Sequence, residues 1–437
     1  MIGVLPALAV AMLLQPRVLI DDFESVLQWR AMPSDDVSLT IGQDKGVSGR
    51  SIRIDFDFHG HGGYSVIRRD VDLVLPANYE FSFSIRGDAP VNTLEFKLVD
   101  PSGDNVWWSN QPGFVFHPDW RRVVRRKRHI TFAWGPAGGG EMKNVAGIEI
   151  AITAGTGGKG TVWIDDLVLT PLEPDAPYDL TPAVSARSAL PGFGAQRALD
   201  GDTSTSWRAA AGRQHVVDVD FLRRREFGGL VIDWEQGRRP RSYSVSTSTD
   251  GTTWTDGYSV GASSRDRDYL YLPESDARHV RMTLDATSGV VGLREITVQP
   301  LAWSATLNDF FSAVSRDAPA GSYPRYYTDK QSYWTVVGVS GDTREGMTDE
   351  EGKIESGKGQ FSVEPFLFSG GRLLTWSDVT RTTTAVGTDL PIPVVTWTSP
   401  GLEMTITSFA AGPADSSVLY ARYRLRNLTA SPQSTTL

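Results

Sequence analysis

The sequence predicts an all-β protein with two consecutive β-sandwich domains and a third β-sandwich that the chain leaves incomplete. Segments in which apolar and polar residues alternate recur along the chain, and a period of two is that of a half-buried strand. Glycine (43 residues) and proline (25 residues) are abundant and supply the turns between short strands. Helical periodicity is scarce, and 437 residues leave room for about three domains.

Composition and charge exclude several functions. The net charge of −9 argues against a nucleic-acid partner, because phosphate binding draws on a basic field. The chain has no cysteine, which excludes thiolate nucleophiles and cysteine metal sites. Hydrophobic residues make up 40% of the chain and aromatic residues 10%. This composition is sufficient for globular cores.

The N-terminus carries an apolar run, residues 1–14, that is too short to span a bilayer. It is typical of the hydrophobic part of a secretion signal, and Ala9-Val-Ala11 offers a small-x-small cleavage pattern. No lysine or arginine precedes the run, so either the start is misassigned or the signal is atypical. We expect residues 1–19 to be a signal peptide and the protein to be secreted or bound to the cell surface. No later segment is long and apolar enough to span a membrane.

Residues 20–172 are predicted to form the first sandwich. Ser51–Phe58, Tyr79–Ile85 and Thr93–Leu98 alternate strictly between apolar and polar residues, so each is expected to bury one face. The basic run Arg121–His129 is interleaved with valines, which favours a solvated strand over a nucleic-acid patch. His59 and His61 lie in a glycine-rich stretch without a nearby third ligand and are interpreted as loop residues rather than a metal site.

Three segments of this domain resemble jelly-roll carbohydrate-binding modules: Asp21–Glu24 at the start, Gly46–Ser51 in the second strand and Val162–Val168 at the end. The resemblance implies that the first and last strands pair and that a structural calcium ion lies where their acidic residues meet. The alternative is that these acids are solvated residues of edge strands. The matching calcium ligands are Asp22, Glu24, Asp165 and Asp166.

Tryptophans crowd the middle of the same domain. Pyranose rings present flat C–H faces that stack on aromatic rings, so Trp107, Trp108, Trp120 and Trp134 are candidate saccharide-binding residues. Each could instead be a packing residue. Because adjacent residues of a strand point to opposite faces, at most one of Trp107 and Trp108 is expected in the core.

A proline-dense linker, residues 173–178, precedes the second domain, residues 179–302. Within the segment Arg197–Trp207, Asp200, Asp202 and Thr205 surround Gly201, so several hard oxygens can converge on a small volume. Calcium takes six to eight such oxygens. The alternative is that the two aspartates only cap a turn.

This segment, together with Gly292–Val298 about ninety residues later, resembles the signature of discoidin (coagulation factor 5/8 type C) domains, which bacteria use as carbohydrate-binding modules. Further matches are residues 217–220, 229–234 and 248–254. The fold implied is galactose-binding-like, and a version without cysteine resembles bacterial members. The resemblance implies calcium ligation by the carbonyls of Arg197 and Arg294 and by the side chains of Asp200, Asp202, Thr205 and Glu295.

In that family the ligand is held by variable loops at one end of the barrel. The loop before the calcium segment supplies Phe193 as a candidate stacking residue. Trp207, Trp234 and Trp254 belong to the signature or to expected strands, and we interpret them mainly as core residues.

Residues 303–437 form the third segment, in which Tyr323–Gly338, Gly401–Thr407 and Val418–Asn427 are strand-like. It resembles, more loosely, the β-sandwich that precedes an α/α-barrel in several glycoside hydrolases and phosphorylases, and we expect the chain to be truncated before such a domain. Its acidic cluster, Asp349–Glu351 with Glu355, lies among glycines and is predicted to be a solvated loop. No motif of a nucleophile elbow, phosphate loop or metalloprotease helix occurs, so no catalytic residue is assigned and enzymatic activity is left open.

The function predicted from the sequence is carbohydrate binding by non-catalytic, calcium-stabilised modules of a secreted bacterial protein related to glycoside hydrolases. We expect an oligo- or polysaccharide partner, structural Ca²⁺, a monomer, and neither a nucleic-acid nor a membrane partner. One alternative is a cell-surface adhesion or anionic-lipid-binding discoidin protein without an enzymatic domain. Another is that the segment from Trp303 onward is catalytic by itself.

Overall fold

The computed structural model describes residues 17–173, 178–286, 290–328, 330–357, 359–387 and 390–437. The chain divides into two units, Met1–Pro177 and Tyr178–Leu437. Most of the expected signal peptide and linker lies outside the described residues. The fold is all-β, as predicted, with one α-helix among the described residues. None of the described helices has the length and apolarity to cross a membrane.

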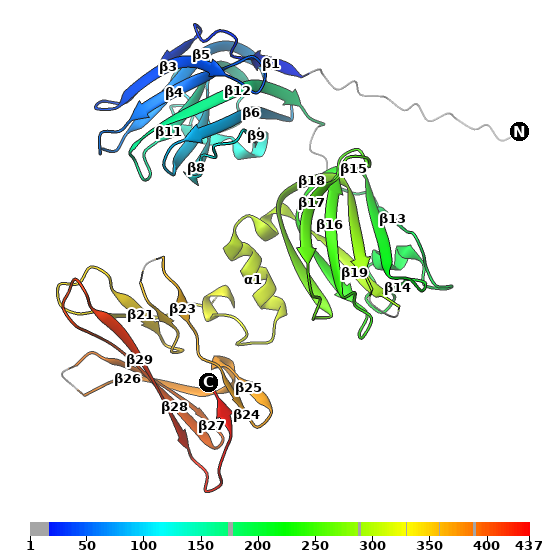
Figure 1. Ribbon diagram of the computed structural model, residues 1–437, viewed down its shortest axis with the longest axis vertical. Helices are drawn as coiled ribbons and strands as arrows, with labels where there is room; N and C mark the ends of the chain where they lie inside the picture. The colour runs from blue at the N-terminus through cyan, green and yellow to red at the C-terminus, as the bar shows by residue number, and fades with distance from the viewer. Residues whose placement is uncertain (1–16, 174–177, 287–289, 329, 358, 388–389) are drawn as a thin grey trace, which may run out of the picture. The chain divides into compact units, whose positions relative to one another are not determined.

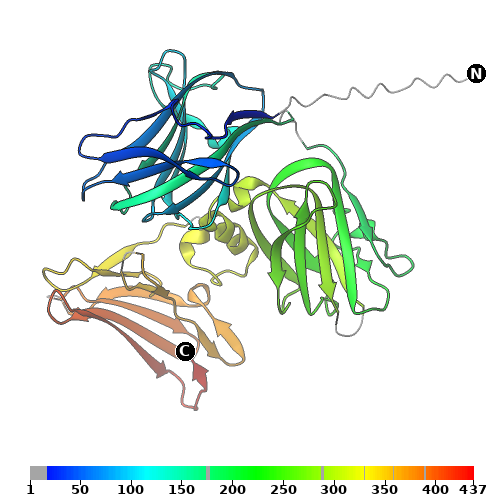
Figure 2. The same cartoon turned by 45° about the horizontal axis from the view of Figure 1, so that its top comes forward.

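The first unit is a sandwich of two antiparallel sheets (Figure 1 and Figure 2). The first sheet has the order β3-β4-β12-β6-β9, with β1 beside β12, and the second has the order β10-β8-β7-β11-β5-β2. The strands of the first sheet are β1 (Val18–Asp21), β3 (Ser38–Lys45), β4 (Arg50–Asp57), β6 (Tyr79–Asp88), β9 (Arg121–Arg126) and β12 (Lys159–Pro171). Those of the second are β2 (Trp29–Ala31), β5 (Tyr64–Val74), β7 (Asn92–Val99), β8 (Val106–Phe114), β10 (Thr131–Trp134) and β11 (Asn144–Thr153), and a 3-10 turn, η1 (Lys127–His129), follows β9.

The core of this unit lies between the two sheets. Alternation in β6 and β7 directs Phe81, Phe83 and Phe96 inward, where the ring of Phe96 lies 5.0 Å from that of Phe81 and 5.9 Å from that of Phe83. The first and last strands pair, with Leu19 opposite Val168, which confirms the prediction. The basic run forms β9 and η1, and Val123 is its buried residue in β9, as expected for a solvated strand.

The second unit begins with a seven-stranded antiparallel arrangement in which two long strands, β15 and β18, pair with each other at the centre. The first part of β15 pairs with β13 and the last part with β19. Trp207 and Trp234 are buried as predicted. The strands are β13 (Ala183–Ala186), β14 (Trp207–Arg208), β15 (Gln214–Trp234), β16 (Ser242–Ser248), β17 (Thr255–Val260), β18 (Arg267–Asp285) and β19 (Gly292–Gln299), with the 3-10 turn η2 (Ala195–Ala198).

Trp254 is not a core residue, and this part of the prediction is wrong. It is half-buried on the surface, where the guanidinium of Arg281 lies 4.0 Å from its ring centre. Arg281 is in turn paired with Asp218. The tryptophan follows the turn at Gly251 and precedes β17, and its ring meets the side chains of His279 and Arg281 of β18.

A helix that the sequence did not suggest, α1 (Leu307–Asp317), leads into the third segment. Thr306 and Asp309 form a capping box at its start. Phe310 packs against Trp303 at 4.9 Å and against Tyr271 of β18 at 5.3 Å. The 3-10 turns around it are η3 (Leu301–Ser304) and η4 (Arg325–Thr328).

The third segment contains three small antiparallel sheets around Trp376, Trp397, Met404 and Ile406. Figure 1 shows β26 to β29 as one twisted sheet. The strands of the first small sheet are β20 (Trp334–Val337), β21 (Gly346–Asp349), β22 (Ile354–Glu355) and β23 (Ser362–Val363). The others are β24 (Leu367–Ser369), β25 (Arg372–Leu374) and β30 (Thr435–Thr436), and then β26 (Thr380–Ala385), β27 (Pro393–Ser399), β28 (Leu402–Ala411) and β29 (Val418–Asn427), with the turn η5 (Trp376–Asp378).

Candidate functional site

The outer face of the second sheet of the first unit carries a group of aromatic side chains. Pairing places Trp108 opposite Lys97, and Tyr64 opposite Thr153, all on the side away from the core. Trp108 and Trp134 contact edge to face at 5.6 Å. Trp134 is 47% exposed and Tyr64 is 45% exposed, so a ligand can reach two of the three rings.

A buried ion pair lies among these rings. The Lys97 ammonium is 2.8 Å from a carboxylate oxygen of Glu95, and both side chains are less than a tenth exposed. The same ammonium lies 5.8 Å from the ring centre of Tyr64, 6.0 Å from that of Trp108 and 5.5 Å from that of Trp134. A cation at these distances is attracted by the ring faces. The arrangement fixes the aromatic side chains and adds a charged hydrogen-bonding group next to them.

Further along the face, Arg68 of β5 bridges Asp70 and Glu149, and Asp70 also pairs with Arg30 of β2. The face therefore runs from exposed rings to a row of paired charges. Such a surface can stack on the C–H face of a sugar and exchange hydrogen bonds with its hydroxyls. We call the face formed by Tyr64, Trp108, Trp134 and the Lys97–Glu95 pair the aromatic platform.

The four tryptophans predicted as saccharide-binding residues occupy three different environments. Trp108 and Trp134 lie together on the platform. Trp107 is in the core, where its indole N–H donates to the carbonyl of Gly140 at 2.9 Å, so Trp107 is not accessible to a ligand. Trp120 lies beside Arg86 of β6 in the first sheet, and the Arg86 guanidinium also stacks on Trp163 at 3.8 Å.

Sequence reasoning missed Tyr64, Glu95 and Lys97. The alternation of Thr93–Leu98 does contain a signal for two of them, because Leu94, Phe96 and Leu98 are buried in the core. Glu95 and Lys97 must then lie on the opposite face. Only the pairing of β7 with β8 shows that Trp108 lies on this same face.

Two of the four acids predicted to bind calcium in the first unit converge on the turn between β3 and β4. Asp165 is fully buried, and its carboxylate accepts the amide of Val47 at 2.7 Å. Glu24 accepts the amide of Arg50 at 2.8 Å. Burial, with a smaller contribution from the nearby charge of Asp166, raises the pKa of Asp165. Asp22 accepts the nearby amide of Glu24 at 3.3 Å.

The turn itself leaves a small space lined with oxygens. A β-carbon at Gly46 would lie 2.4 Å from a carboxylate oxygen of Asp165, 2.6 Å from the carbonyl oxygen of Arg50 and 2.7 Å from that of Ser48. At Gly49, whose φ is +55°, a β-carbon would overlap the carboxylate of Glu24. Glycine is therefore required at both positions, and two carbonyl oxygens of the turn face one point together with the carboxylate of the distant Asp165.

The calcium segment of the second unit does meet Glu295. Glu295 lies in β19 opposite Asp233 and accepts the amide of Gly201 at 3.1 Å. Asp200 accepts the amide of Asp202 at 3.0 Å and the hydroxyl of Thr205 at 2.8 Å. Residues separated by more than ninety positions thus share one corner of the domain.

Glu295 is 7% exposed, and no lysine or arginine of the described residues forms an ion pair with it. Burial raises its pKa to about 7, and the charges of Asp200, Asp233 and Asp202 contribute in the same direction. Within the described ranges, no three His, Asp or Glu side chains are already arranged around a metal position. The set fits a cation in its charge and oxygen donors.

Phe193, the predicted stacking residue of the second unit, is half-buried. The Arg208 guanidinium lies 3.9 Å from its ring centre and is held by two hydrogen bonds of 2.7 Å to Glu235. One face of the ring is therefore already covered. Burial would raise the pKa of Glu235, but the hydrogen bonds from Arg208 and Ser206 keep it below its usual range.

The acidic cluster of the third segment is not a solvated loop, and that prediction is wrong. Asp349 and Glu351 are buried, and Glu351 pairs with Arg325 at 3.0 Å and with Arg381 at 2.6 Å. Lys353 is also buried and pairs with Glu355 at 3.0 Å. The surrounding glycines made this stretch look mobile, but the cations that neutralise it come from distant positions. Burial raises the pKa of Asp349 to about 6.

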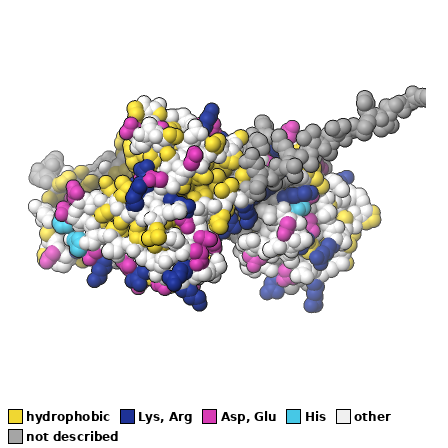
Figure 3. Space-filling model, turned by 90° about the horizontal axis from the view of Figure 1, so that it is seen from above, with side chains coloured by type: hydrophobic (Ala, Val, Ile, Leu, Met, Phe, Trp, Pro, Cys, Tyr) yellow, Lys and Arg dark blue, Asp and Glu magenta, His cyan; other side chains and the backbone are white. Residues whose placement is uncertain are grey.

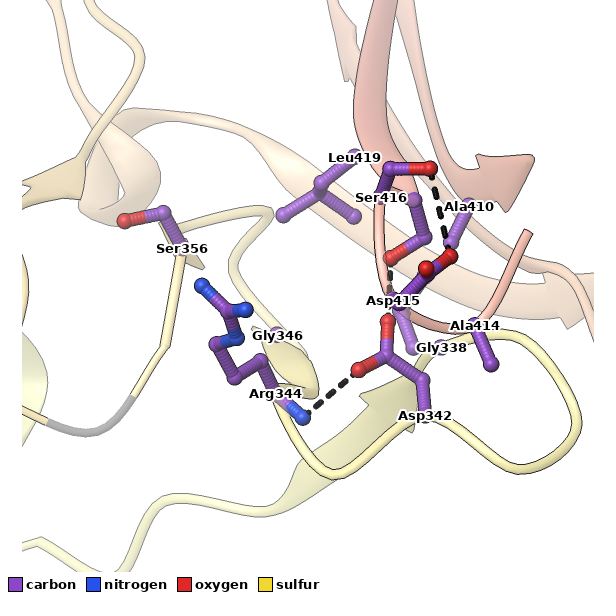
Figure 4. A pocket seen from close by; sticks show the side chains of 12 residues that line it. Gly338, Asp342, Arg344, Gly346, Ser356, Ala410, Ala414, Asp415, Ser416 and Leu419 are labelled. Atoms are coloured by element: carbon purple, nitrogen blue, oxygen red, sulfur yellow. Dashed lines mark hydrogen bonds between the residues drawn. The ribbon is translucent and has the colours of Figure 1, made fainter. Parts of the chain in front are cut away.

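A pocket of about 250 Å³ lies between the β20–β21 connection and the β28–β29 turn. In Figure 4 the Arg344 side chain extends between Ser356 and Leu419, while Asp342 and Asp415 lie at the other end. Asp342 already accepts the amide of Arg344 at 2.8 Å and the hydroxyl of Ser417. The pocket brings together none of the residues that the sequence singled out as candidate site residues.

On the face shown in Figure 3, acidic and basic side chains are interspersed.

The protein is built from all-β sandwich modules. Residues 183–296 match the family model described as F5/8 type C domain. The chain thus contains an F5/8 type C (discoidin) domain, as the resemblance predicted. No curated protein matches the chain.

Several solved structures are similar to parts of the chain. One is the family 11 carbohydrate-binding module of the cellulosomal cellulase Lic26A-Cel5E of Clostridium thermocellum, with 16% identity over 36% of this chain and 95% of that chain and a TM-score of 0.30. Another is chitosan-binding module 1 of a chitosanase/glucanase from Paenibacillus sp. IK-5, with 26% identity, coverage of 28% and 98%, and a TM-score of 0.26. A third is CpGH89CBM32-6 of Clostridium perfringens, with 23% identity, coverage of 28% and 94%, and a TM-score of 0.25.

Proposed function

We propose that the protein binds oligo- or polysaccharides through the aromatic platform of its first unit. The observation that carries this proposal is the exposure of Tyr64 and Trp134 beside Trp108, around the buried Lys97–Glu95 pair. The presence of a discoidin domain in the same chain supports the proposal, because bacteria use such domains to bind carbohydrate.

The extent of the platform favours an oligosaccharide over a single sugar. Its residues come from strands between β10 and β5, and their rings converge on Lys97. The ring centres of Tyr64 and Trp134 lie 5.8 and 5.5 Å from the Lys97 ammonium, so they are at most about 11 Å apart, which is longer than one pyranose ring. The rings would stack on sugar C–H faces. Arg68, whose side chain is partly exposed, would orient the chain through its hydroxyls.

Binding to a panel of neutral polysaccharides by affinity electrophoresis, followed by calorimetry on the best ligand, tests this function. Trp134→Ala is expected to weaken binding about tenfold, because an exposed stacking ring contributes about 1.5 kcal/mol. Trp120→Ala is the matched control, since Trp120 lies outside the platform, just before β9 and beside Arg86 of the other sheet. Equal losses in both variants, or no loss in Trp134→Ala, would contradict the proposal. Sedimentation with anionic liposomes tests the lipid-binding alternative.

Calcium is proposed as a structural ion in both units. In the second unit, the side chains of Asp200, Asp202, Thr205 and Glu295 and the carbonyls of Arg197 and Arg294 would hold it. In the first unit, the carboxylates of Asp22, Glu24, Asp165 and Asp166 would do so with carbonyls of the Gly46–Arg50 turn. The support is the unpaired buried charge of Glu295 and Asp165 and the oxygen-lined space at Gly46. A bound cation would stabilise each domain by mass action without contacting the sugar.

We also propose that the protein is exported and that it belongs with a glycoside hydrolase activity. A carbohydrate-binding chain of this kind would act outside the cell and would deliver a glycoside hydrolase to its polysaccharide. Detection of the protein in culture medium tests its export.

A further inference from the structure

The outer face of the sheet β26–β29 carries an ordered array of threonines bordered by arginines. The pairing of the four strands puts Thr382, Thr396, Thr405 and Arg424 in a single row across the sheet. The opposite face of the same strands supplies Trp397, Met404 and Ile406 to the core, so the row points away from it. Thr380, Thr398, Glu403 and Arg426 form the row before it, and Thr384, Val394, Thr407 and Arg422 the row after it.

The threonine hydroxyls of this array are available. None of the described residues exchanges a side-chain hydrogen bond with Thr382, Thr396 or Thr405, and all three are exposed or half-buried. β-branched residues suit a strand, which accounts for some threonines but not for their alignment on one face. Hydroxyls that repeat at about 4.8 Å across strands and about 6.8 Å along them form a regular set of donors and acceptors.

The arginines lie on the edge strand β29, at every second position. Arg422 and Arg424 are exposed and have no carboxylate within ion-pair distance among the described residues. Arg426 is 3.5 Å from Glu403, and its side chain is 61% exposed. In a chain of net charge −9, other arginines are paired, for example Arg208 and Arg267. Two adjacent unpaired guanidinium groups therefore mark this edge as a local anion-binding surface.

We propose that the outer face of β26–β29 binds an extended anionic polysaccharide that lies along β29. Its carboxylate or sulfate groups would be held by Arg422 and Arg424, because a guanidinium presents a planar fork to such anions. Its hydroxyls would bond to the neighbouring threonines. Tyr420, stacked on Phe409 at 5.2 Å, precedes the arginines on β29 and would contact a sugar ring at that end of the strand.

Other polyanions suit this face less well. A membrane surface would require large exposed apolar side chains among the charges, whereas the central rows are formed mainly by threonines. A nucleic acid would require a broad basic field, and here the basic side chains lie along one strand, beside strands that present threonines and the acidic Glu403. The site is distinct from the aromatic platform of the first unit and does not depend on it.

The test is binding of the full chain to polygalacturonate, which carries only carboxylates, and to dextran sulfate, which carries only sulfates, with uncharged dextran as the reference. The double variant Arg422→Gln/Arg424→Gln is expected to bind at least one of the two polyanions about tenfold or more weakly, because charge-assisted hydrogen bonds are lost. The control Arg213→Gln/Arg265→Gln removes the same charge at exposed positions outside this face and should bind like the parent chain.

A second variant separates recognition from simple charge attraction. Thr396→Val/Thr405→Val keeps the charge and the side-chain volume and is expected to weaken binding several-fold. Equal weakening by the two double arginine variants, or unchanged binding in the threonine variant, would overturn the proposal. So would the absence of binding to both polyanions, or tighter binding to a polyribonucleotide. If the arginines serve only to prevent strand addition at this edge, the Arg422/Arg424 variant will oligomerise without losing affinity, and the proposal fails. Trp134→Ala should leave this binding unchanged, which distinguishes it from the platform.

Discussion

Arg381→Met is expected to destabilise the third segment by about 3–5 kcal/mol, because it leaves a buried carboxylate without one of its two cations. Glu351 is 1% exposed, and one of its carboxylate oxygens lies 2.6 Å from Arg381. Arg381 also donates to the carbonyl of Trp376 and lies 5.5 Å from the centre of its ring. Hydrogen exchange, measured on peptides covering residues 345–357, would report the loss of stability as faster exchange.

Arg372→Met is the matched control in the same segment. Arg372 pairs with Asp378 at 3.3 Å, but its side chain is 65% exposed. An exposed pair contributes at most about 1 kcal/mol, so this variant should be close to the parent protein in stability. Similar destabilisation by both substitutions would show that the network around Glu351 is not a buried one.

Without calcium, the discoidin domain is expected to lose stability as the pH rises from about 4.5 to about 7. The reason is Glu295, whose pKa burial raises from 4.5 to about 7. Between these values the folded state binds more protons than the unfolded state, so the free energy of unfolding falls with rising pH. A shift of this size corresponds to about 3 kcal/mol. Calcium would compensate the charge of Glu295 and its neighbouring aspartates and restore the stability above pH 7.

Thermal unfolding with EDTA and with millimolar calcium, at pH 5 and pH 8, would measure both effects. Glu295→Gln should flatten the pH dependence in EDTA and abolish most of the stabilisation by calcium. Magnesium at the same concentration is the control, because it requires a more rigid octahedral site. An unfolding temperature at pH 8 that is the same with EDTA and with calcium would refute the assignment.

The fold was predictable because apolar and polar residues alternate in segments such as Ser51–Phe58 and Thr93–Leu98. This alternation indicates strands with one buried face. The meeting of Glu295 with Gly201 was predicted from a family resemblance, since no local rule connects residues more than ninety positions apart. Cross-strand pairing is the information that the sequence lacks. It groups Tyr64 with Trp108 around Lys97, and it aligns the threonines of β26 to β28.

The errors have a common physical cause. Asp349–Glu351 was expected in solvent because carboxylates among glycines are costly to bury alone. Arg325 and Arg381, which make the burial possible, lie about thirty positions away on either side. Trp254 was expected in the core because large rings usually pack inside, but Arg281 covers it from a neighbouring strand. In each case a partner from another element determined the environment of the residue.

The pairing of β1 with β12 also affects how the first unit can be joined to other polypeptides. Val18 lies opposite Leu169, so the chain enters and leaves this unit about 5 Å apart. A cassette with adjacent ends can be grafted into a surface turn of a host protein with little distortion of the host backbone. Recombination at these two positions would therefore yield folded chimaeras more readily than breaks elsewhere in the sandwich.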